Sequence, residues 1–153
     1  IFRGDHLNVY KRYISFLKKN NFQNIARMTA DNIFTDINEA KKLIRLHINK
    51  GSHYSSNHSD YLPKGMGIDI FETSKLIQLE KFKLTKYDQE HLNSYFIKNR
   101  KKFKTIFYKR NNIYTNLNLS IDTINDFKFI KRNYFLLKKV KSYRDLNNFK
   151  LKF

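Results

Sequence analysis

The hydrophobic and polar positions of the chain follow helical and extended spacing in turn. Apolar residues at helical spacing near the start of the chain are Val9, Tyr10, Tyr13, Ile14 and Leu17. They predict an amphipathic helix that ends at the polar run 18–21. A short strand is predicted at 24–28. A second helix is predicted to begin at a cap, Asp36 or Asn38, and to end at Gly51, because these residue types favour the two helix termini.

The rest of the chain continues the alternation. Further short strands are predicted at 54–57, 68–71, 104–109 and 119–122. Further helices are predicted from Thr73 to about Leu79, from Asp88 to about Asn99, and from Thr123 or Ile124 to Phe135. Segment 58–67 holds the only proline and two of the four glycines, so it is predicted to be the main loop. Strands that alternate with helices indicate an α/β fold around a mostly parallel sheet.

Composition narrows the function classes. Of the 153 residues, 41% are hydrophobic and 29% are charged, which is the balance of a folded chain rather than a disordered one. There is no cysteine, so disulfides, zinc–thiolate sites and thiol nucleophiles are excluded. No apolar run approaches the roughly 20 residues of a membrane helix, and no signal peptide is recognisable. We therefore expect a cytoplasmic protein with no membrane partner.

The net charge of +18 invites a nucleic-acid interpretation, because lysine and arginine neutralise phosphates. The basic residues are scattered along the chain, however, and no helix-turn-helix or RRM-type signature is present. Lys, Asn, Ile, Phe and Tyr all have codons rich in A and T, so a biased genome composition accounts for the lysines without a partner. We expect no nucleic-acid binding, although dispersed lysines can attract an anionic nucleotide.

Two acidic residues follow predicted strands, where an open α/β sheet binds its ligand. Asp31 comes after the first strand, and Asp122 ends the last one; Asp69 lies inside a strand beside the glycine-rich loop. Mg²⁺ is commonly held by one or two carboxylates together with substrate phosphates, so the pair Asp31 and Asp122 is suited to it. The structural alternative is that both residues merely cap the helices that follow them.

Five strings resemble, in order, motifs of the cytidylyltransferase family of spore coat polysaccharide biosynthesis protein F, a relative of the CMP-KDO and CMP-sialic acid synthetases. They are Phe-Arg-Gly-Asp at 2–5 with Val9, Arg12 and Tyr13; Arg-Met-Thr-Ala-Asp-Asn at 27–32 with Asp36; Ser-Asn at 56–57 and Leu-Pro-Lys-Gly-Met-Gly-Ile-Asp-Ile-Phe at 62–71; Tyr-Asp-Gln-Glu-His at 87–91; and Leu-Ser-Ile-Asp-Thr at 119–123 with Asp126. The resemblance covers 1–135, as the C-terminal portion of a cytidylyltransferase domain, and leaves 136–153 as a basic tail or an extra helix.

The resemblance implies a Rossmann-like nucleotide-diphospho-sugar transferase sheet of the glycosyltransferase-A type, truncated at its N-terminus. The implied activity is Mg²⁺-dependent coupling of CTP to a sugar acid of the KDO, sialic or related nonulosonic type. The products are a CMP-sugar and pyrophosphate, in surface polysaccharide biosynthesis. By this resemblance Asp31 and Asp122 hold the metal, Arg27 and Asp31 are catalytic, and the substrate-binding residues are Asp69, Glu90 and His91. A homodimer paired around 58–70 is compatible with it.

Several of these assignments have structural alternatives. Arg27 is equally suited to a buried salt bridge, and Glu90 with His91 to a capping pair at a helix start beside a half-buried imidazole. Lys64 can meet an anionic acceptor, but a solvated lysine is the simpler interpretation. The remaining histidines form no metal-binding spacing and receive no role; they are His6, His47, His53 and His58.

The sequence also departs from the family. Gly67 stands where the family has an acidic residue, and Asp69 replaces a glutamate. The family's first strand and phosphate-binding loop would lie before Ile1, so we expect these residues alone to bind CTP poorly and to turn over negligibly. The alternative function is a degenerate homologue that binds nucleotide or sugar without transfer. Gly67 favours that alternative, whereas Asp31 and Asp122 disfavour it.

Overall fold

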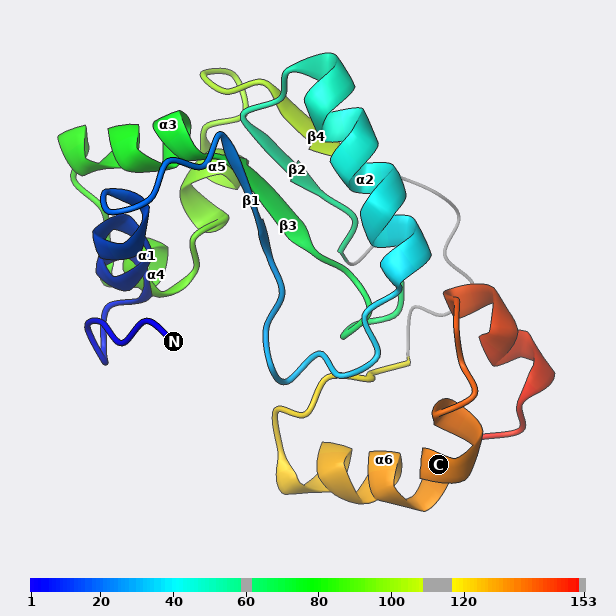
Figure 1. The fold of residues 1–153 in the computed structure, drawn as a ribbon. Coiled ribbons are helices and arrows are strands. Elements are labelled where there is room, and N and C mark those ends of the chain that lie inside the picture. The colour runs from blue at the N-terminus through cyan, green and yellow to red at the C-terminus, as the bar shows by residue number, and fades with distance from the viewer. Residues whose placement is uncertain (59–61, 109–116, 152–153) are drawn as a thin grey trace.

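A four-stranded sheet lies at the centre of the fold (Figure 1). The computed structural model describes residues 1–58, 62–108 and 117–151. The strands are β1 (Asn24–Arg27), β2 (Tyr54–Ser56), β3 (Asp69–Glu72) and β4 (Thr105–Phe107). Their order is β1-β3-β2-β4, with β3 antiparallel to both of its neighbours and β2 parallel to β4.

The expected α/β class is confirmed, but the prediction of a mostly parallel sheet is wrong. A parallel pair needs a long crossover, usually through a helix. The connection from β2 to β3 has no helix among its described residues. The chain therefore turns back on itself, and β3 pairs antiparallel with β2, with Tyr54 opposite Phe71 and Ser56 opposite Asp69.

Helices cover both faces of the sheet (Figure 1). They are α1 (Val9–Leu17), α2 (Ile37–Lys50), α3 (Thr73–Gln78) followed by the 3₁₀ helix η1 (Leu79–Lys81), α4 (Lys86–Glu90), α5 (Ser94–Lys98), α6 (Ile124–Leu137) and the 3₁₀ helix η2 (Tyr143–Asn148). Side chains of successive strand residues point to opposite faces of the sheet, so Phe71 and Ile70 of β3 pack into different hydrophobic cores. Phe71 packs with α1, α3 and α5, whereas Ile70 packs with Ala40 and Leu43 of α2. None of the helices in the described part of the chain has the length and apolar character of a membrane span.

The larger core is built from aromatic rings. Tyr54 and Phe71, on neighbouring strands, have ring centroids 5.1 Å apart, and Phe96 of α5 lies 5.5 Å from the first and 5.6 Å from the second. All three side chains are fully buried. Stacked and edge-to-face rings add to the free energy gained by burying their surface. Residues from β2, β3 and α5 are thereby joined in one cluster.

Helix α2 shows how local sequence signals mark its boundaries. Asp36 caps its first turn by accepting a hydrogen bond from the Glu39 amide at 3.0 Å, which selects Asp36 over Asn38 of the two predicted caps. Gly51 ends the helix at φ +56°, a left-handed conformation that glycine adopts without a steric cost.

The helix predicted from Asp88 to about Asn99 is instead two short helices, α4 and α5. Thr85 caps α4, with Asp88 as its capping-box partner. The buried Asp88 carboxylate also accepts hydrogen bonds from Ser94 and, at 2.9 Å, from Lys98 of α5. Burial by itself would raise the pKa of Asp88, but the hydrogen bonds from Ser94, Thr85 and Lys98 outweigh it and hold that pKa below its usual range. One carboxylate thus joins the two helices.

Two other segments differ from the predictions, and the C-terminal segment matches one of its two predicted alternatives, an extra helix. Thr73 is the first residue of α3 rather than its cap, which is Glu72. The strand predicted at 119–122 does not form; the chain there makes one isolated β-bridge, between Asn118 and Lys64. Of residues 138–151, 143–148 form η2, where Leu146 is buried and the Tyr143 amide donates to the Asp36 carboxylate at 2.8 Å. This end of the chain therefore packs on the domain.

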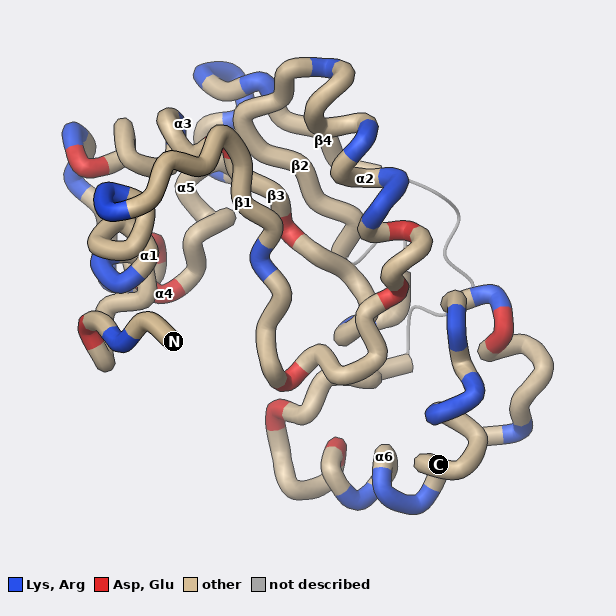
Figure 2. The backbone as a smooth tube through the Cα atoms, viewed as in Figure 1, with Lys and Arg blue, Asp and Glu red and all other residues tan. Residues whose placement is uncertain are grey.

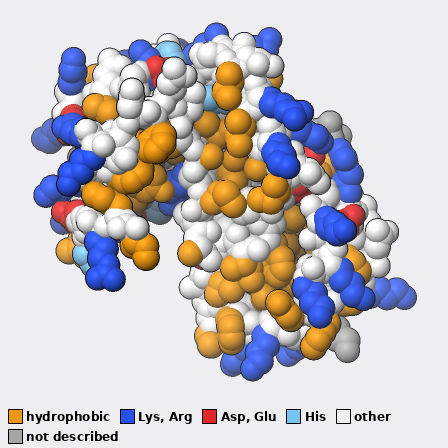
Figure 3. All heavy atoms as spheres, in the orientation of Figure 1, with side chains coloured by type: hydrophobic (Ala, Val, Ile, Leu, Met, Phe, Trp, Pro, Cys, Tyr) orange, Lys and Arg blue, Asp and Glu red, His pale blue; other side chains and the backbone are white. Residues whose placement is uncertain are grey.

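Strand β1 lies at an edge of the sheet, and apolar side chains are exposed beside it. Met28 and Ile33 follow β1, and Ile37 and Ile48 share one face of α2; each is about half exposed. Figure 3 shows apolar side chains gathered over the middle of this side of the molecule. Unpaired strand edges and apolar patches of this kind are typical of surfaces that other protein segments cover.

The aromatic cluster gives a prediction about stability. Phe96→Ala should lower the free energy of unfolding by about 3–5 kcal/mol, because it leaves a cavity between β2, β3 and α5. Phe135→Ala removes the same side chain from a position that is 72% exposed and should cost less than about 1 kcal/mol. Urea unfolding followed by circular dichroism measures both. Equal losses for the two variants would contradict this account of the core.

Candidate functional site

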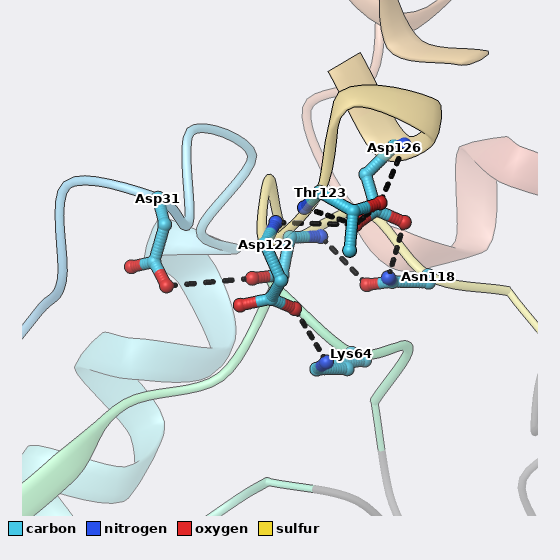
Figure 4. A network of polar contacts seen from close by, with 7 residues as sticks. Asp31, Lys64, Asn118, Asp122, Thr123 and Asp126 are labelled. Atoms are coloured by element: carbon cyan, nitrogen blue, oxygen red, sulfur yellow. Dashed lines mark hydrogen bonds and ion pairs between the residues drawn. The ribbon is translucent and has the colours of Figure 1, made fainter. Parts of the chain in front are cut away.

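Backbone contacts bring three distant segments together at the ends of the strands. The Ile121 amide donates to the Asp31 carbonyl at 3.1 Å, and the Leu119 amide donates to the Lys64 carbonyl at 2.8 Å. Asp31 follows β1, and Lys64 precedes β3. The segment that leads into α6 is therefore attached to both, and Asp122 lies between Asp31 and Lys64 (Figure 4).

Gly65 makes this close approach possible. Its φ is +92°, and a Cβ atom there would lie 2.5 Å from backbone atoms of both Leu119 and Ser120. No side chain fits at that distance, and the positive φ also disfavours other residues. Lys64 is thus held by its own backbone next to the segment that carries Asp122.

A polar network holds the turn before α6 (Figure 4). Asp126 accepts hydrogen bonds from the Thr123 amide at 2.7 Å, from the Asp122 amide at 3.2 Å and from the Asn118 side chain at 2.9 Å. The hydrogen bond from the Thr123 hydroxyl, together with these others, lowers the pKa of Asp126. Thr123 itself caps α6, so the backbone on both sides of Asp122 is fixed.

Asp31 carries an oxygen with no partner. Its Oδ2 lies 3.5 Å from the Ser120 hydroxyl, whereas its Oδ1 is buried and accepts no hydrogen bond among the described residues. A buried carboxylate oxygen without a donor is costly, and a bound cation removes that cost. The alternative that Asp31 and Asp122 cap the following helices is wrong, because Asp36 caps α2 and Thr123 caps α6.

The two carboxylates suit a magnesium ion that is shared with a ligand. The carboxylates of Asp31 and Asp122 point to the same side in Figure 4. Among the described residues no three His, Asp or Glu side chains form a metal cluster of their own. Mg²⁺ is commonly held by one or two carboxylates with water and phosphate oxygens in its remaining positions. The unpartnered Asp31 Oδ1 is the atom that such an ion would satisfy.

A second acidic group, Asp69, is buried at the start of β3. The Tyr54 hydroxyl donates to its Oδ1 at 2.7 Å, and its Oδ2 lies 3.5 Å from His58 Nε2 and 3.7 Å from Arg27 Nη1. Burial alone would raise the pKa of Asp69, but the hydrogen bond and charge of His58, the Tyr54 hydroxyl and the Arg27 guanidinium together lower it. The same burial, with the nearby Asp69 charge, raises the pKa of Tyr54.

The Asp69 cluster, which is Asp69 with Tyr54, His58 and Arg27, bears on both interpretations of Arg27. The Arg27 guanidinium forms the salt bridge that was the structural alternative, with a carboxylate that is only 1% exposed. This salt bridge follows from the register of the sheet, since Arg27 and Asp69 are opposite one another on β1 and β3. The Arg27 side chain is itself about one-quarter exposed, so it also has surface open to a ligand.

His58 is a residue of this cluster that sequence reasoning missed. It shows no metal-binding spacing, and its one sequence signal is its place just after a strand. A Cβ atom on Gly67 would lie 2.7 Å from His58 Nδ1 and 3.1 Å from the Asn57 side chain. The imidazole therefore fills the space next to Gly67, which accounts for a glycine at that position.

The other residues singled out by sequence lie elsewhere. Glu90 is the exposed last residue of α4, and the His91 ring packs 4.2 Å from the Tyr87 ring. They are not the capping pair of that helix, since Thr85 and Asp88 are. No contact among the described residues joins Glu90 or His91 to Asp31, Asp69 or Asp122.

His47 and the scattered basic residues do not mark a binding site. His47 is buried between α2 and the sheet, with Nδ1 2.8 Å from the Ser55 hydroxyl and Nε2 3.0 Å from Asn24 Oδ1, and burial lowers its pKa. It is a packing residue. The lysines and arginines are spread over helices and loops at both ends of the molecule (Figure 2).

Comparison with known proteins finds a similar fold in one class of enzyme. The structure superposes on a cytidylyltransferase from Leptospira borgpetersenii serovar Hardjo-bovis with a TM-score of 0.85 and 29% identity, over 96% of this chain and 63% of that one. The chain has a cytidylyltransferase-like fold. It is also 30% identical over 131 residues, 84% of its length, to an uncharacterised protein of Methanocaldococcus jannaschii. It spans 53% of that relative. No protein-family model matches the chain.

The depressed pKa of Asp69 predicts how stability depends on pH. A carboxyl with a lower pKa in the folded state contributes stability above its unfolded pKa, near 3.8, and loses that contribution as the pH falls through the folded pKa. Asp69→Asn should therefore lower the free energy of unfolding at pH 7 by about 1–3 kcal/mol. The difference from the parent protein should shrink below about pH 4.

Urea unfolding at pH 7 and pH 3 measures this effect. Glu80→Gln is the matched control, because Glu80 is an exposed carboxylate paired with Lys18. A constant difference between Asp69→Asn and the parent protein at both pH values would show that Asp69 is not held ionised by its neighbours.

Proposed function

We propose that this protein is part of a Mg²⁺-dependent cytidylyltransferase that couples CTP to a sugar acid, giving a CMP-sugar and pyrophosphate for surface polysaccharide. The cytidylyltransferase-like fold supports the class of reaction. The observation that carries the proposal is the pair Asp31 and Asp122, which lie side by side, with a buried carboxylate oxygen of Asp31 that has no partner in the part of the chain that the structure describes.

In this reaction a hydroxyl oxygen of the sugar acid attacks the α-phosphorus of CTP. A new phosphorus–oxygen bond forms as the bond to the bridging oxygen breaks, and pyrophosphate leaves with the electron pair. The hydroxyl proton passes to solvent or to a nearby base. Such transfers depend on positioning and on compensation of charge, without a covalent enzyme intermediate.

Asp31 and Asp122 are the residues that would hold Mg²⁺. The bound ion would supply positive charge to the phosphate oxygens of the nucleotide. The backbone contacts at Ile121 and Leu119 keep the two carboxylates together before any ligand binds, so little reorganisation is needed when it does. The basic surface raises the local concentration of an anionic nucleotide.

Arg27 and the Asp69 cluster have the supporting role in this proposal. Asp69 was predicted to bind the substrate. Because it is buried, in this proposal it orients Arg27 and His58 instead of touching the substrate itself. The Arg27 side chain, about one-quarter exposed, is then available to a phosphate. Glu90 and His91 remain assigned to the sugar acid; Glu90 is exposed at the end of α4, and His91, its C-cap residue, is half-buried.

A non-catalytic binding homologue is the second candidate, and one observation favours it. The Lys64 ammonium lies 2.5 Å from Asp122 Oδ2, so its positive charge opposes a metal ion on the same carboxylate. A lysine that stayed there permanently would weaken metal binding at Asp122.

The proposal predicts the effect of removing either carboxylate. Asp31→Asn and Asp122→Asn keep the size of the side chain and remove its charge, and each should lower pyrophosphate release by about 100-fold or more. Release is measured with CTP, Mg²⁺ and a panel of sugar acids, using the protein as its source organism makes it. Glu80→Gln removes a carboxylate far from these segments in sequence and should leave the rate unchanged.

Full activity of both variants would overturn the proposal. Mn²⁺–CTP binding that Asp122→Asn leaves unchanged, without pyrophosphate release for any sugar acid, would support the binding homologue instead.

A further inference from the structure

The proposed reaction assigns no role to Lys64, although this lysine contacts Asp122, one of the two proposed metal ligands. Its ammonium lies 2.5 Å from Asp122 Oδ2, and both side chains are largely exposed, at 63% and 41%. Figure 4 shows Asp122 with Asp31 on one side and Lys64 on the other. An isolated exposed ion pair contributes little to stability. Stability alone is therefore a weak reason for a lysine at this position.

The backbone explains why Lys64 returns to the same place. Lys64 forms a β-bridge with Asn118, its carbonyl accepts from the Leu119 amide, and Gly65 is packed against Leu119 and Ser120. Its Cα is thus fixed beside the Asp122 segment. The side chain beyond it has four rotatable bonds and a point charge, so the ammonium can leave Asp122 while the backbone stays in place.

The ammonium and a divalent cation compete for the same carboxylate, that of Asp122. Lys64 occupies Asp122 Oδ2, while Asp31 Oδ1 is buried and has no hydrogen-bond partner among the described residues. A metal ion held by Asp31 and Asp122 would repel the ammonium, because like charges a few ångströms apart are unfavourable even near the surface.

We propose that Lys64 is a tethered counter-ion of Asp122, which holds that carboxylate in place without metal and is released when the divalent cation binds. This inference rests on the metal site of the proposed function. Lys64 is a positioning residue in it. The released ammonium then lies beside the cation site, where it can pair with an anionic group of the substrate.

The competition can be measured with the metal alone. Mn²⁺ binding is followed by electron paramagnetic resonance for the parent protein, Lys64→Met and Lys64→Arg. Lys64→Met should bind Mn²⁺ about two- to fivefold more tightly, which is the factor that corresponds to an exposed ion pair. Lys64→Arg keeps the positive charge and should restore affinity to within about twofold of the parent.

Lys18→Met is the matched control for the loss of one positive charge. Lys18 pairs with Glu80 at 2.8 Å, with exposures of 55% and 41%, close to those of the Lys64 pair. It should leave Mn²⁺ affinity unchanged. In a parallel Mg²⁺ titration followed by nitrogen NMR of the lysine side chains, the signal that Lys64→Met removes should shift with the same midpoint as metal binding.

Two outcomes would overturn the inference. One is equal Mn²⁺ affinity for Lys64→Met and the parent protein, and the other is a Lys64 signal that stays in place while the metal site fills. A different result would overturn the proposed metal site itself, namely Mn²⁺ binding that neither Asp31→Asn nor Asp122→Asn weakens. Failure of the lysine's role is thereby distinguished from failure of the site.

Discussion

The candidate site depends on backbone hydrogen bonds that attach the segment before α6 to two loops of the sheet. The Ile121 amide binds the Asp31 carbonyl, and the Leu119 amide binds the Lys64 carbonyl. Gly65 lets its backbone approach the backbone of Leu119 and Ser120 more closely than any side chain at position 65 would allow. Without these contacts Asp122 would have no fixed relation to Asp31, and neither the proposed metal pair nor the Lys64 contact would exist.

The sheet supports this arrangement through the directions of its strands. β1 ends at Arg27 and is followed by Asp31. The antiparallel β3 begins at Asp69, so Arg27 and Asp69 are opposite one another. The buried Asp69 is compensated by groups from three places in the chain, which allows a charge to persist inside the sheet. Beside it lies the open edge of β1, with exposed apolar groups nearby. The two relatives extend beyond the region they share with this chain.

Local sequence signals predicted much of this fold. The first helix and the stop at Gly51 follow from side-chain chemistry within one or two turns, and they were predicted correctly; Asp36 was one of the two predicted caps of α2. The position of Asp31 in a loop after a strand was also accessible. The antiparallel direction of β3 could not be predicted in this way, because it depends on a connection without a described helix rather than on the residues of the strand. The break between α4 and α5 depends on Asp88 accepting from two helices at once.

The electrostatic details of the site could not be predicted for a related reason. The His58 contact with Asp69 depends on side chains meeting across strands, and the Lys64 contact with Asp122 depends on a β-bridge between distant segments. Spacing along the chain carries no signal for either. Gly67 is informative in retrospect, since the structure shows the His58 ring in the space that a side chain at 67 would need.

The most direct test of the account is a crystal structure of the natural protein, isolated from its source organism, with CTP and Mn²⁺, using anomalous scattering to locate the metal. The account predicts an anomalous peak in coordinating contact with Asp31 Oδ1 and an Asp122 carboxylate oxygen, with the Lys64 ammonium moved away from Asp122. A metal ion located elsewhere, with Lys64 still paired to Asp122 and Asp31 Oδ1 still without a partner, would contradict it.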